Sequence, residues 1–286
     1  MNNFNPRAMY TVAKKEFLDN IRNKWAIILT ILFVLIIVLF TYTYGSGASG
    51  LGSKELMEEI IFGLLGITSI LIPLIAIILG FSTISGEAES GSLYVVLSYP
   101  IRRVEVLLGK LLGLGSIIIL SILIGFSLGG IAIVITVGPG LESWIGYIGF
   151  IFLSIFLGFI YLSLSICISA FCKRRITSIG GGILVFFWSM IYGTLLMAIL
   201  YATGGTFEDL MKGNIPEWFF NSVVFSPGDL HQTAVQRAFG VETIDVMNFS
   251  FTIPEFLSSF NLIIFHIIWF IVPLILAYYF FKRRDV

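Results

Sequence analysis

The sequence predicts an all-α integral membrane protein with six transmembrane helices and with both termini in the cytosol. Hydrophobic residues make up 57% of the 286-residue chain, and charged residues only 12%. A soluble domain carries about 25% charged residues. Long apolar runs recur along the chain, and lysines and arginines gather between alternate runs. These observations favour a single membrane domain, 1–286.

Each predicted span is an apolar run of about 20 residues or more, which as a helix crosses a bilayer core of about 30 Å. The third run exceeds this length, so we expect it to tilt or to project from the membrane. The first run is too long for a cleavable signal peptide, so we expect it to be retained. The six runs are Trp25–Tyr44, Ile60–Ile84, Val106–Val137, Trp144–Phe171, Ile176–Tyr201 and Phe260–Phe281.

Basic residues predict the orientation, because cytosolic loops of membrane proteins carry an excess of lysine and arginine. Most of the 17 basic residues precede the first span, follow the sixth, or lie between the second and third or the fourth and fifth spans. The loops on the other side are acidic. The expected cytosolic residues are Arg7, Lys14, Lys15, Arg22, Lys24, Arg102, Arg103, Lys110, Lys173, Arg174, Arg175, Lys282, Arg283 and Arg284.

Segment 8–24 has the periodicity of an amphipathic helix. Apolar residues recur at four-residue steps from Met9 to Trp25, and basic residues occupy the other faces. Such a helix is expected to lie along the inner membrane surface. It serves either as an electrostatic anchor or as a contact for a cytosolic partner. The residues singled out on it are Lys15, Glu16, Phe17, Ile21 and Arg22.

The outer segment 202–259 is predicted to contain short helices. One is expected from Thr206 to Gly213, and another after Ser226, with Ser226 as N-cap and proline at the first helical position. The run Trp218–Phe225 is too apolar for a free loop and too short to span, which favours a re-entrant or interfacial segment covered by protein. This segment is expected to plug or cap the outer end of the bundle, and the residues singled out on it, here called the outer-gate residues, are Trp218, Phe219, Phe220, Pro227 and Asp229.

Ionisable residues are nearly absent from the spans, and His266 is the exception. We expect a neutral, hydrogen-bonded packing role for it. His231 and Asp229 are two residues apart and so point to different helix faces, which favours helix capping by Asp229 over a metal site. Pumps and channels usually carry charges inside their spans. The energy source is therefore expected to lie outside the membrane.

No phosphate-binding loop of the G-x4-G-K-[ST] type is present, so the chain is not expected to be an enzyme or to bind a cofactor. Its net charge is zero, which argues against a nucleic-acid partner.

The loop Ile84–Lys110 carries acids, bases, three glycines and a proline between two spans, more than a plain connector needs. Its residues Ser85-Gly86-Glu87-x-Glu89-x-Gly91-Ser92-Leu93, followed by Pro100, Arg103 and Leu107-Leu108-Gly109-Lys110, resemble the cytosolic signature of ABC-2 type transporter permeases. The resemblance is closest to the branch with the nitrous-oxide-reductase maturation permease. The N-terminal Lys15-Glu16, six spans and a large loop before the last also match.

This resemblance implies a permease subunit of an exporter in the plasma membrane of a bacterium or archaeon. It would pair with a second permease subunit, as a homodimer. Two copies of a separate ATP-binding subunit would hold ATP and Mg. A coupling helix, Glu87–Leu97 within loop 85–105, would offer Leu93, Val96 and Leu97 as a ridge to a groove of that subunit. The implied coupling residues are Glu87, Glu89, Gly91, Leu93, Val96, Leu97, Pro100 and Arg103.

Two alternatives remain at this stage. The same machinery would serve a mechanical transducer that moves an extracytoplasmic partner protein and transports nothing. The other is an ion-coupled carrier or an embedded enzyme.

Overall fold

The computed structural model describes residues 4–47, 53–138, 144–206, 216–240, 243–246, 249–252 and 254–284. Within them, six helices are long and apolar enough to cross a membrane, which confirms the predicted number of spans. They are α2 (Lys24–Gly47), α3 (Ser53–Gly80), α6 (Arg103–Thr136), α7 (Trp144–Phe171), α8 (Arg175–Ala202) and α12 (Ser259–Arg283).

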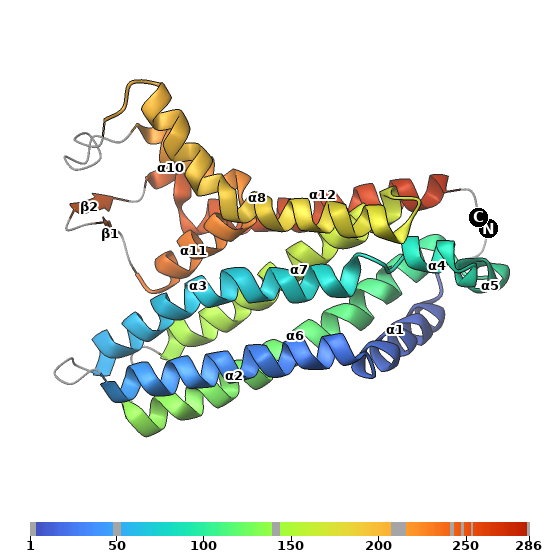
Figure 1. Cartoon of the computed structure of the whole chain (residues 1–286), viewed down its shortest axis with the longest axis horizontal. Helices are drawn as coiled ribbons and strands as arrows, with labels where there is room; N and C mark the ends of the chain where they lie inside the picture. Colours follow the sequence, from blue (N-terminus) through green and yellow to red (C-terminus); the bar gives the residue numbers. More distant parts are fainter. Residues whose placement is uncertain are drawn as a thin grey trace.

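The shorter elements gather at the two ends of the bundle (Figure 1). One end, here called the terminal end, carries α1 (Pro6–Ile21), α4 (Ser85–Glu89), α5 (Ser92–Ser98) and the last turn of α12. The opposite end carries α10 (Glu217–Asn221), η1 (Ser222–Phe225), α11 (Pro227–Ala238), η2 (Glu255–Leu257) and a two-stranded hairpin.

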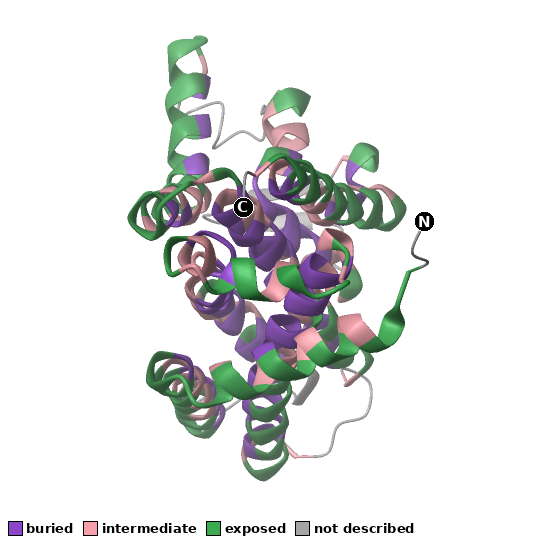
Figure 2. Cartoon of the chain, turned by 90° about the vertical axis from the view of Figure 1, so that its right-hand side faces the viewer, coloured by how far each residue is buried: buried purple, intermediate pink, exposed green. Residues whose placement is uncertain are grey.

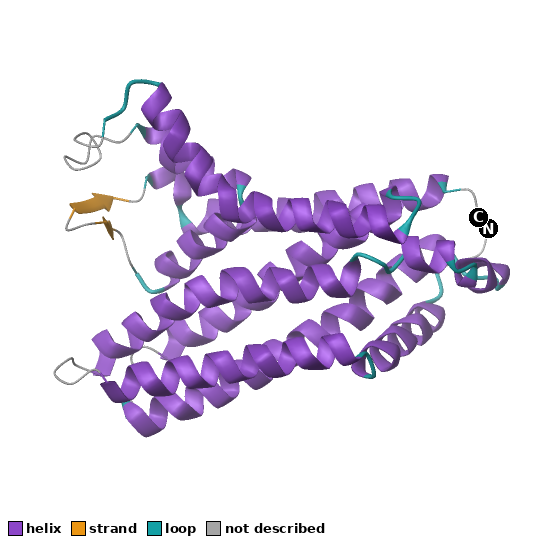
Figure 3. Cartoon of the chain, in the orientation of Figure 1, coloured by secondary structure: helices purple, strands orange, loops and turns teal. Residues whose placement is uncertain are grey.

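The outer segment also contains a hairpin, which the sequence did not predict beside the short helices. Strands β1 (Thr243–Val246) and β2 (Phe249–Thr252) pair antiparallel (Figure 3). Two strands of four residues give too short an alternation to be distinguished from loop in a sequence. The predicted helix at 206–213 lies outside the described residues, apart from Thr206.

Helices α6 and α7 form the centre of the bundle, and buried residues concentrate along its middle (Figure 2). Helix α6 contacts α1, α2 and α7, while α7 contacts α3, α11 and α12. Phe126 of α6 lies at the heart of the core and packs edge-to-face against Phe33, Tyr147 and Phe150. Such aromatic packing fixes the mutual rotation of α2, α6 and α7.

Helix α1 crosses the beginning of α6 at close range. A methyl group at Gly113 would lie 2.5 Å from the Ala13 carbonyl oxygen, and one at Gly109 would lie 2.7 Å from Val12 Cβ. The small residues therefore let the two backbones meet. The predicted apolar stripe of α1 is only partly buried. Met9 and Phe17 are half-buried, whereas Ile21 is 43% exposed and Trp25 69% exposed.

The outer segment packs back onto the spans. Ser226 caps α11 and Pro227 follows at the first helical position, as predicted. Aromatic donors from two spans hold η1 in place. Tyr192 donates to the Ser222 carbonyl at 2.6 Å, and Trp269 donates to the Val224 carbonyl at 2.8 Å. These bonds satisfy backbone groups that a helix would otherwise pair internally.

Candidate functional site

The predicted coupling helix is two helices with a break between them. Helix α4 ends at Glu89, and α5 begins at Ser92. Gly91 between them has a φ of 77°, a left-handed conformation that glycine adopts without steric cost. The expectation of one continuous helix over Glu87–Leu97 is therefore corrected, because the chain turns at this glycine.

The predicted docking ridge faces the interior of this chain rather than a partner. Leu93 is fully buried in this chain's own core, and Val96 and Leu97 pack partly against it. The residues that α5 exposes are Tyr94 at 55% and Val95 at 62%. The turn at Gly91 rotates α5 so that its most apolar side closes the bundle.

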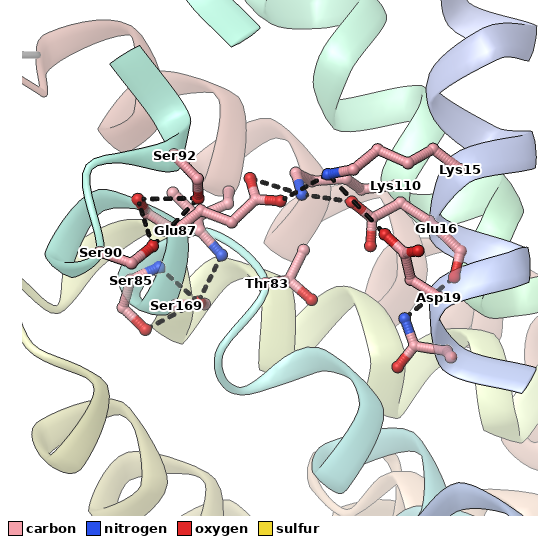
Figure 4. A network of polar contacts seen from close by, with 12 residues as sticks. Lys15, Glu16, Asp19, Thr83, Ser85, Glu87, Ser90, Ser92, Lys110 and Ser169 are labelled. Carbon is pink, nitrogen blue, oxygen red and sulfur yellow. Dashed lines mark hydrogen bonds and ion pairs between the residues drawn. The ribbon is translucent and has the colours of Figure 1, made fainter. Parts of the chain in front are cut away.

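A buried lysine connects this segment to α1. Lys110 of α6 is 1% exposed. Its Nζ lies 2.6 Å from Glu16 Oε1 on α1 and 2.8 Å from Glu87 Oε2 on α4 (Figure 4). Long helical side chains point back toward the helix N-terminus, which directs the ammonium of Lys110 to the terminal end. One ammonium thus joins three elements distant in sequence.

Lys15 adds a second, more exposed cation to the same cluster. Its Nζ lies 3.4 Å from Glu87 Oε1 and 4.0 Å from Asp19 Oδ2. Burial lowers the pKa of Lys15, but the neighbouring carboxylates of Glu87 and Glu16 more than offset this, so the pKa lies above its usual value. Two lysines therefore face Glu16 and Glu87, and we call these four residues the charge cluster.

Side chains from other elements cap the helix ends around the cluster. Ser169 Oγ of α7 accepts hydrogen bonds from the backbone amides of Ile84 and Ser85, each at 3.0 Å, at the start of α4. Glu89 accepts a bond of 2.7 Å from the backbone amide of Arg175, at the start of α8. These bonds satisfy amides that a helix leaves unpaired. They also hold α4 against α7 and α8.

Two arginines cap the C-terminal ends of helices α12 and α7. Arg103 donates to the carbonyls of Phe281, Lys282 and Arg284 at the end of α12. Arg284 in turn donates to carbonyls of Ser169, Ala170, Cys172 and Lys173 at the end of α7. Arg103 is thus engaged within the chain, whereas Pro100 and Arg22 are exposed.

The predicted outer-gate residues lie together but differ in burial. Pro227 is buried and Asp229 is half-buried, whereas Trp218 is 39% exposed. Phe219 and Phe220 are half-buried. The Ser226 hydroxyl accepts the Asp229 amide at 3.4 Å, so serine rather than aspartate is the cap.

Both histidines are buried at this end of the bundle. His266 Nδ1 lies 2.7 Å from the Leu262 carbonyl oxygen, in the packing role expected for it. In the part of the chain that the structure describes, no three metal-ligating side chains come together.

The sequence alone did not identify Lys110 as part of the site. In the sequence it appears as a basic residue at the edge of a span and as the last residue of the family signature, with no partner indicated. A signal was nevertheless present, since Lys110 follows an apolar run and precedes another, where an unpaired ammonium would be costly.

Comparison with known proteins agrees with this architecture. The family model described as ABC-2 family transporter protein matches residues 10–286. A probable ABC transporter permease protein NosY from Pseudomonas aeruginosa is 30% identical over 283 residues, which cover 97% of this chain and 99% of that protein. NosY from Stutzerimonas stutzeri is 28% identical over 282 residues, covering 96% and 98%. The chain therefore belongs to the ABC-2 family of transporter proteins and is a multi-pass membrane protein.

Proposed function

We propose that this ABC transporter permease subunit is an exporter, driven from the cytosol by a separate ATP-binding subunit that docks on α4 and α5. The family match and the two relatives named as permeases support the permease function itself. The docking surface would be the exposed face of α5, with Tyr94 and Val95, together with Tyr99 at 68% exposure. Exposed aromatic and apolar side chains of this kind are typical anchors of protein interfaces.

The observation that carries the coupling proposal is the position of Glu87. It stands on the docking segment, yet its carboxylate is tied to Lys110 inside a span, and Lys110 is tied to Glu16. A push on α4 would therefore act on α6 and α1 together. Rigid-body motion of packed helices is a common means of transmitting such a push.

The remaining parts of the proposal follow from the same arrangement. The terminal end would face the cytosol, as the basic residues indicate. ATP and Mg would be held by two copies of the ATP-binding subunit. A second copy of this chain would complete the membrane part as a homodimer. The mechanical-transducer alternative gains no support from the relatives, whose names describe permeases.

A site-specific cross-link tests this docking. A photoreactive phenylalanine analogue replaces Tyr94 in the tagged chain, which is illuminated in native membranes and purified. We expect an ATP-binding-cassette subunit to be attached. The matched control carries the analogue at Ile135, which is 71% exposed near the other end of α6. Absence of such a subunit at Tyr94, or equal attachment at both positions, would contradict the proposal.

A further inference from the structure

A cavity of about 720 Å³ lies between α3, α8 and the η1–α11 segment. This volume is within the range of small-molecule sites, about 300–1,000 Å³. The lining includes apolar side chains, among them Met190, Met197 and Phe219. It also includes the polar side chains of Ser69, Ser189, Thr194, Asp229 and Gln232. Such a mixed lining suits a ligand that has both an apolar body and a polar group.

Among the described residues that line this cavity, Asp229 is the one that is ionisable. Its Oδ2 is buried and has no hydrogen-bond partner among the described residues, and no lysine or arginine of that part of the chain forms an ion pair with it. Buried polar groups normally have a partner. Burial raises the pKa of Asp229 above its usual value, although a hydrogen bond with the Ser226 hydroxyl acts in the opposite direction. Within the described residues, the carboxyl group therefore lacks a cationic partner.

The backbone around Asp229 fixes the position of its side chain. The carbonyl of Asp229 accepts a hydrogen bond from Thr233 Oγ1 at 3.0 Å, and its amide donates to Ser226. Gly228 lets this first turn of α11 approach α8, since a methyl group there would lie 2.4 Å from Ser189 Oγ. The carboxyl group is thus held at the cavity by helix geometry rather than by a flexible loop.

Two glycines keep the cavity open. Gly66 of α3 and Gly193 of α8 both line it, and a methyl group at either would meet nothing within 4 Å. Close helix contact explains Gly109 and Gly113, but it does not explain this pair. Glycine also weakens a helix by about 1 kcal/mol relative to alanine. The missing side chains at Gly66 and Gly193 leave room for a ligand.

We propose that this cavity binds amphipathic organic cations, with a protonated amine on Asp229 and an apolar body along Met190, Met197 and Phe219. The amine would supply the charge-assisted hydrogen bonds that the carboxylate lacks. As a statement about cargo, this rests on the proposed transport function. As a statement about binding, it depends on the permease chain alone.

Equilibrium binding of a fluorescent amine tests the proposal. The probe is dansylcadaverine, which has a primary amine on an alkyl chain beside an aromatic group. Its uncharged counterpart is N-acetyl-dansylcadaverine. Fluorescence anisotropy is measured on the purified full chain in lipid nanodiscs. We expect the amine to bind about tenfold more tightly than the acetylated probe, a difference of about 1.4 kcal/mol.

Two variants locate the binding. Asp229→Asn keeps the shape of the side chain, and we expect it to remove the preference for the amine. Gly193→Leu fills the cavity, and we expect it to weaken both probes about tenfold or more. The matched controls are Glu217→Gln, an exposed acid of the same outer segment, and Gly180→Leu, a glycine of α8 that also faces open space but does not line the cavity. Both controls should bind as the unaltered chain does.

The outcomes separate this proposal from the preceding one. Equal binding of the two probes by the unaltered chain would overturn it, and so would a preference that persists in Asp229→Asn. Size-exclusion profiles and thermal unfolding check that each variant is folded. Because no ATP-binding subunit is present, failure of the cross-linking experiment at Tyr94 leaves this result intact.

Discussion

The ammonium group of Lys110 lies 2.6 Å from the carboxylate of Glu16, and these side chains are only 2% and 9% exposed. An ion pair in this position is costly to form, because both charges leave water. Its stability depends on the pair remaining complete. The contact therefore fixes α1 on α6 in one arrangement, and Glu87 extends the same constraint to α4.

Replacing Lys110 with methionine should strongly destabilise the chain. The substitution leaves Glu16 and Glu87 without their shared cation, and breaking a buried ion pair costs about 3–5 kcal/mol. Thermal unfolding in detergent measures the loss. Lys15→Met is the control, since that side chain is 51% exposed and its ion pairs are of the weak surface kind.

A second substitution shows whether the loss comes from the unpaired charge. In the double variant Lys110→Met, Glu16→Gln one stranded carboxylate is gone, so we expect part of the stability to return. If the losses of stability in Lys110→Met alone and in Glu16→Gln alone instead sum to the loss in the double variant, the two residues do not interact, and the ion pair does not hold the helices together.

Ser169→Ala should loosen the start of α4. It removes the acceptor of two buried backbone amides, those of Ile84 and Ser85, and an unsatisfied buried donor costs about 1–3 kcal/mol. Hydrogen exchange of these amides should accelerate. Ser163→Ala is the matched control, because Ser163 is buried and, within the described residues, bonds only to Ile160 of its own helix. Equal exchange in both variants would show that Ser169 does not cap α4.

Gly113→Ala should separate α1 from α6. The added methyl group would lie 2.5 Å from the Ala13 carbonyl and 2.7 Å from Glu16 Cβ, so α1 must move. We expect faster proteolysis of α1 and a lower unfolding temperature. Gly66→Ala adds the same methyl group in open space, so α1 should stay intact and the unfolding temperature should not fall, because alanine favours the helix by about 1 kcal/mol. A stable Gly113→Ala variant with an intact α1 would refute this close approach.

Local pattern was enough to predict the spans and the cap of α11. Hydropathy locates α7 to the residue, because Trp144 follows polar residues and Phe171 precedes a basic run. Ser226 followed by proline predicts a helix start, and the structure has it there. Both features depend on residues close in sequence.

The charge cluster depends on residues far apart in sequence, so pattern could not predict it. Glu16, Glu87 and Lys110 each appear as ordinary charges near a membrane surface. They meet only because Gly109 and Gly113 bring α1 onto α6 and because the chain turns at Gly91. The same turn buries Leu93, for which the family resemblance had implied a place on an exposed ridge.

The stability of the chain should depend on the ionisation of Asp229. Burial raises the pKa of this carboxyl group above its usual value of 3.8, so the folded state holds the proton more tightly than the unfolded state. This contribution to stability is complete below pH 3.8 and is lost as the pH rises through the raised pKa. The difference in unfolding free energy between Asp229→Asn and the unaltered chain should therefore grow with pH across that window. A difference that does not vary with pH would contradict this assignment.

The central claim is that Lys110 holds α1 and the α4–α5 segment as one body. Spin labels at Tyr10 on α1 and at Tyr99 after α5, both well exposed, report the distance between the two by pulsed electron resonance, with Cys167 and Cys172 replaced by alanine. We predict one narrow distance distribution for the unaltered chain and for Lys15→Met, and a broad or displaced one for Lys110→Met. A Lys110→Met distribution with the same width and the same mean distance as that of the unaltered chain would contradict the claim.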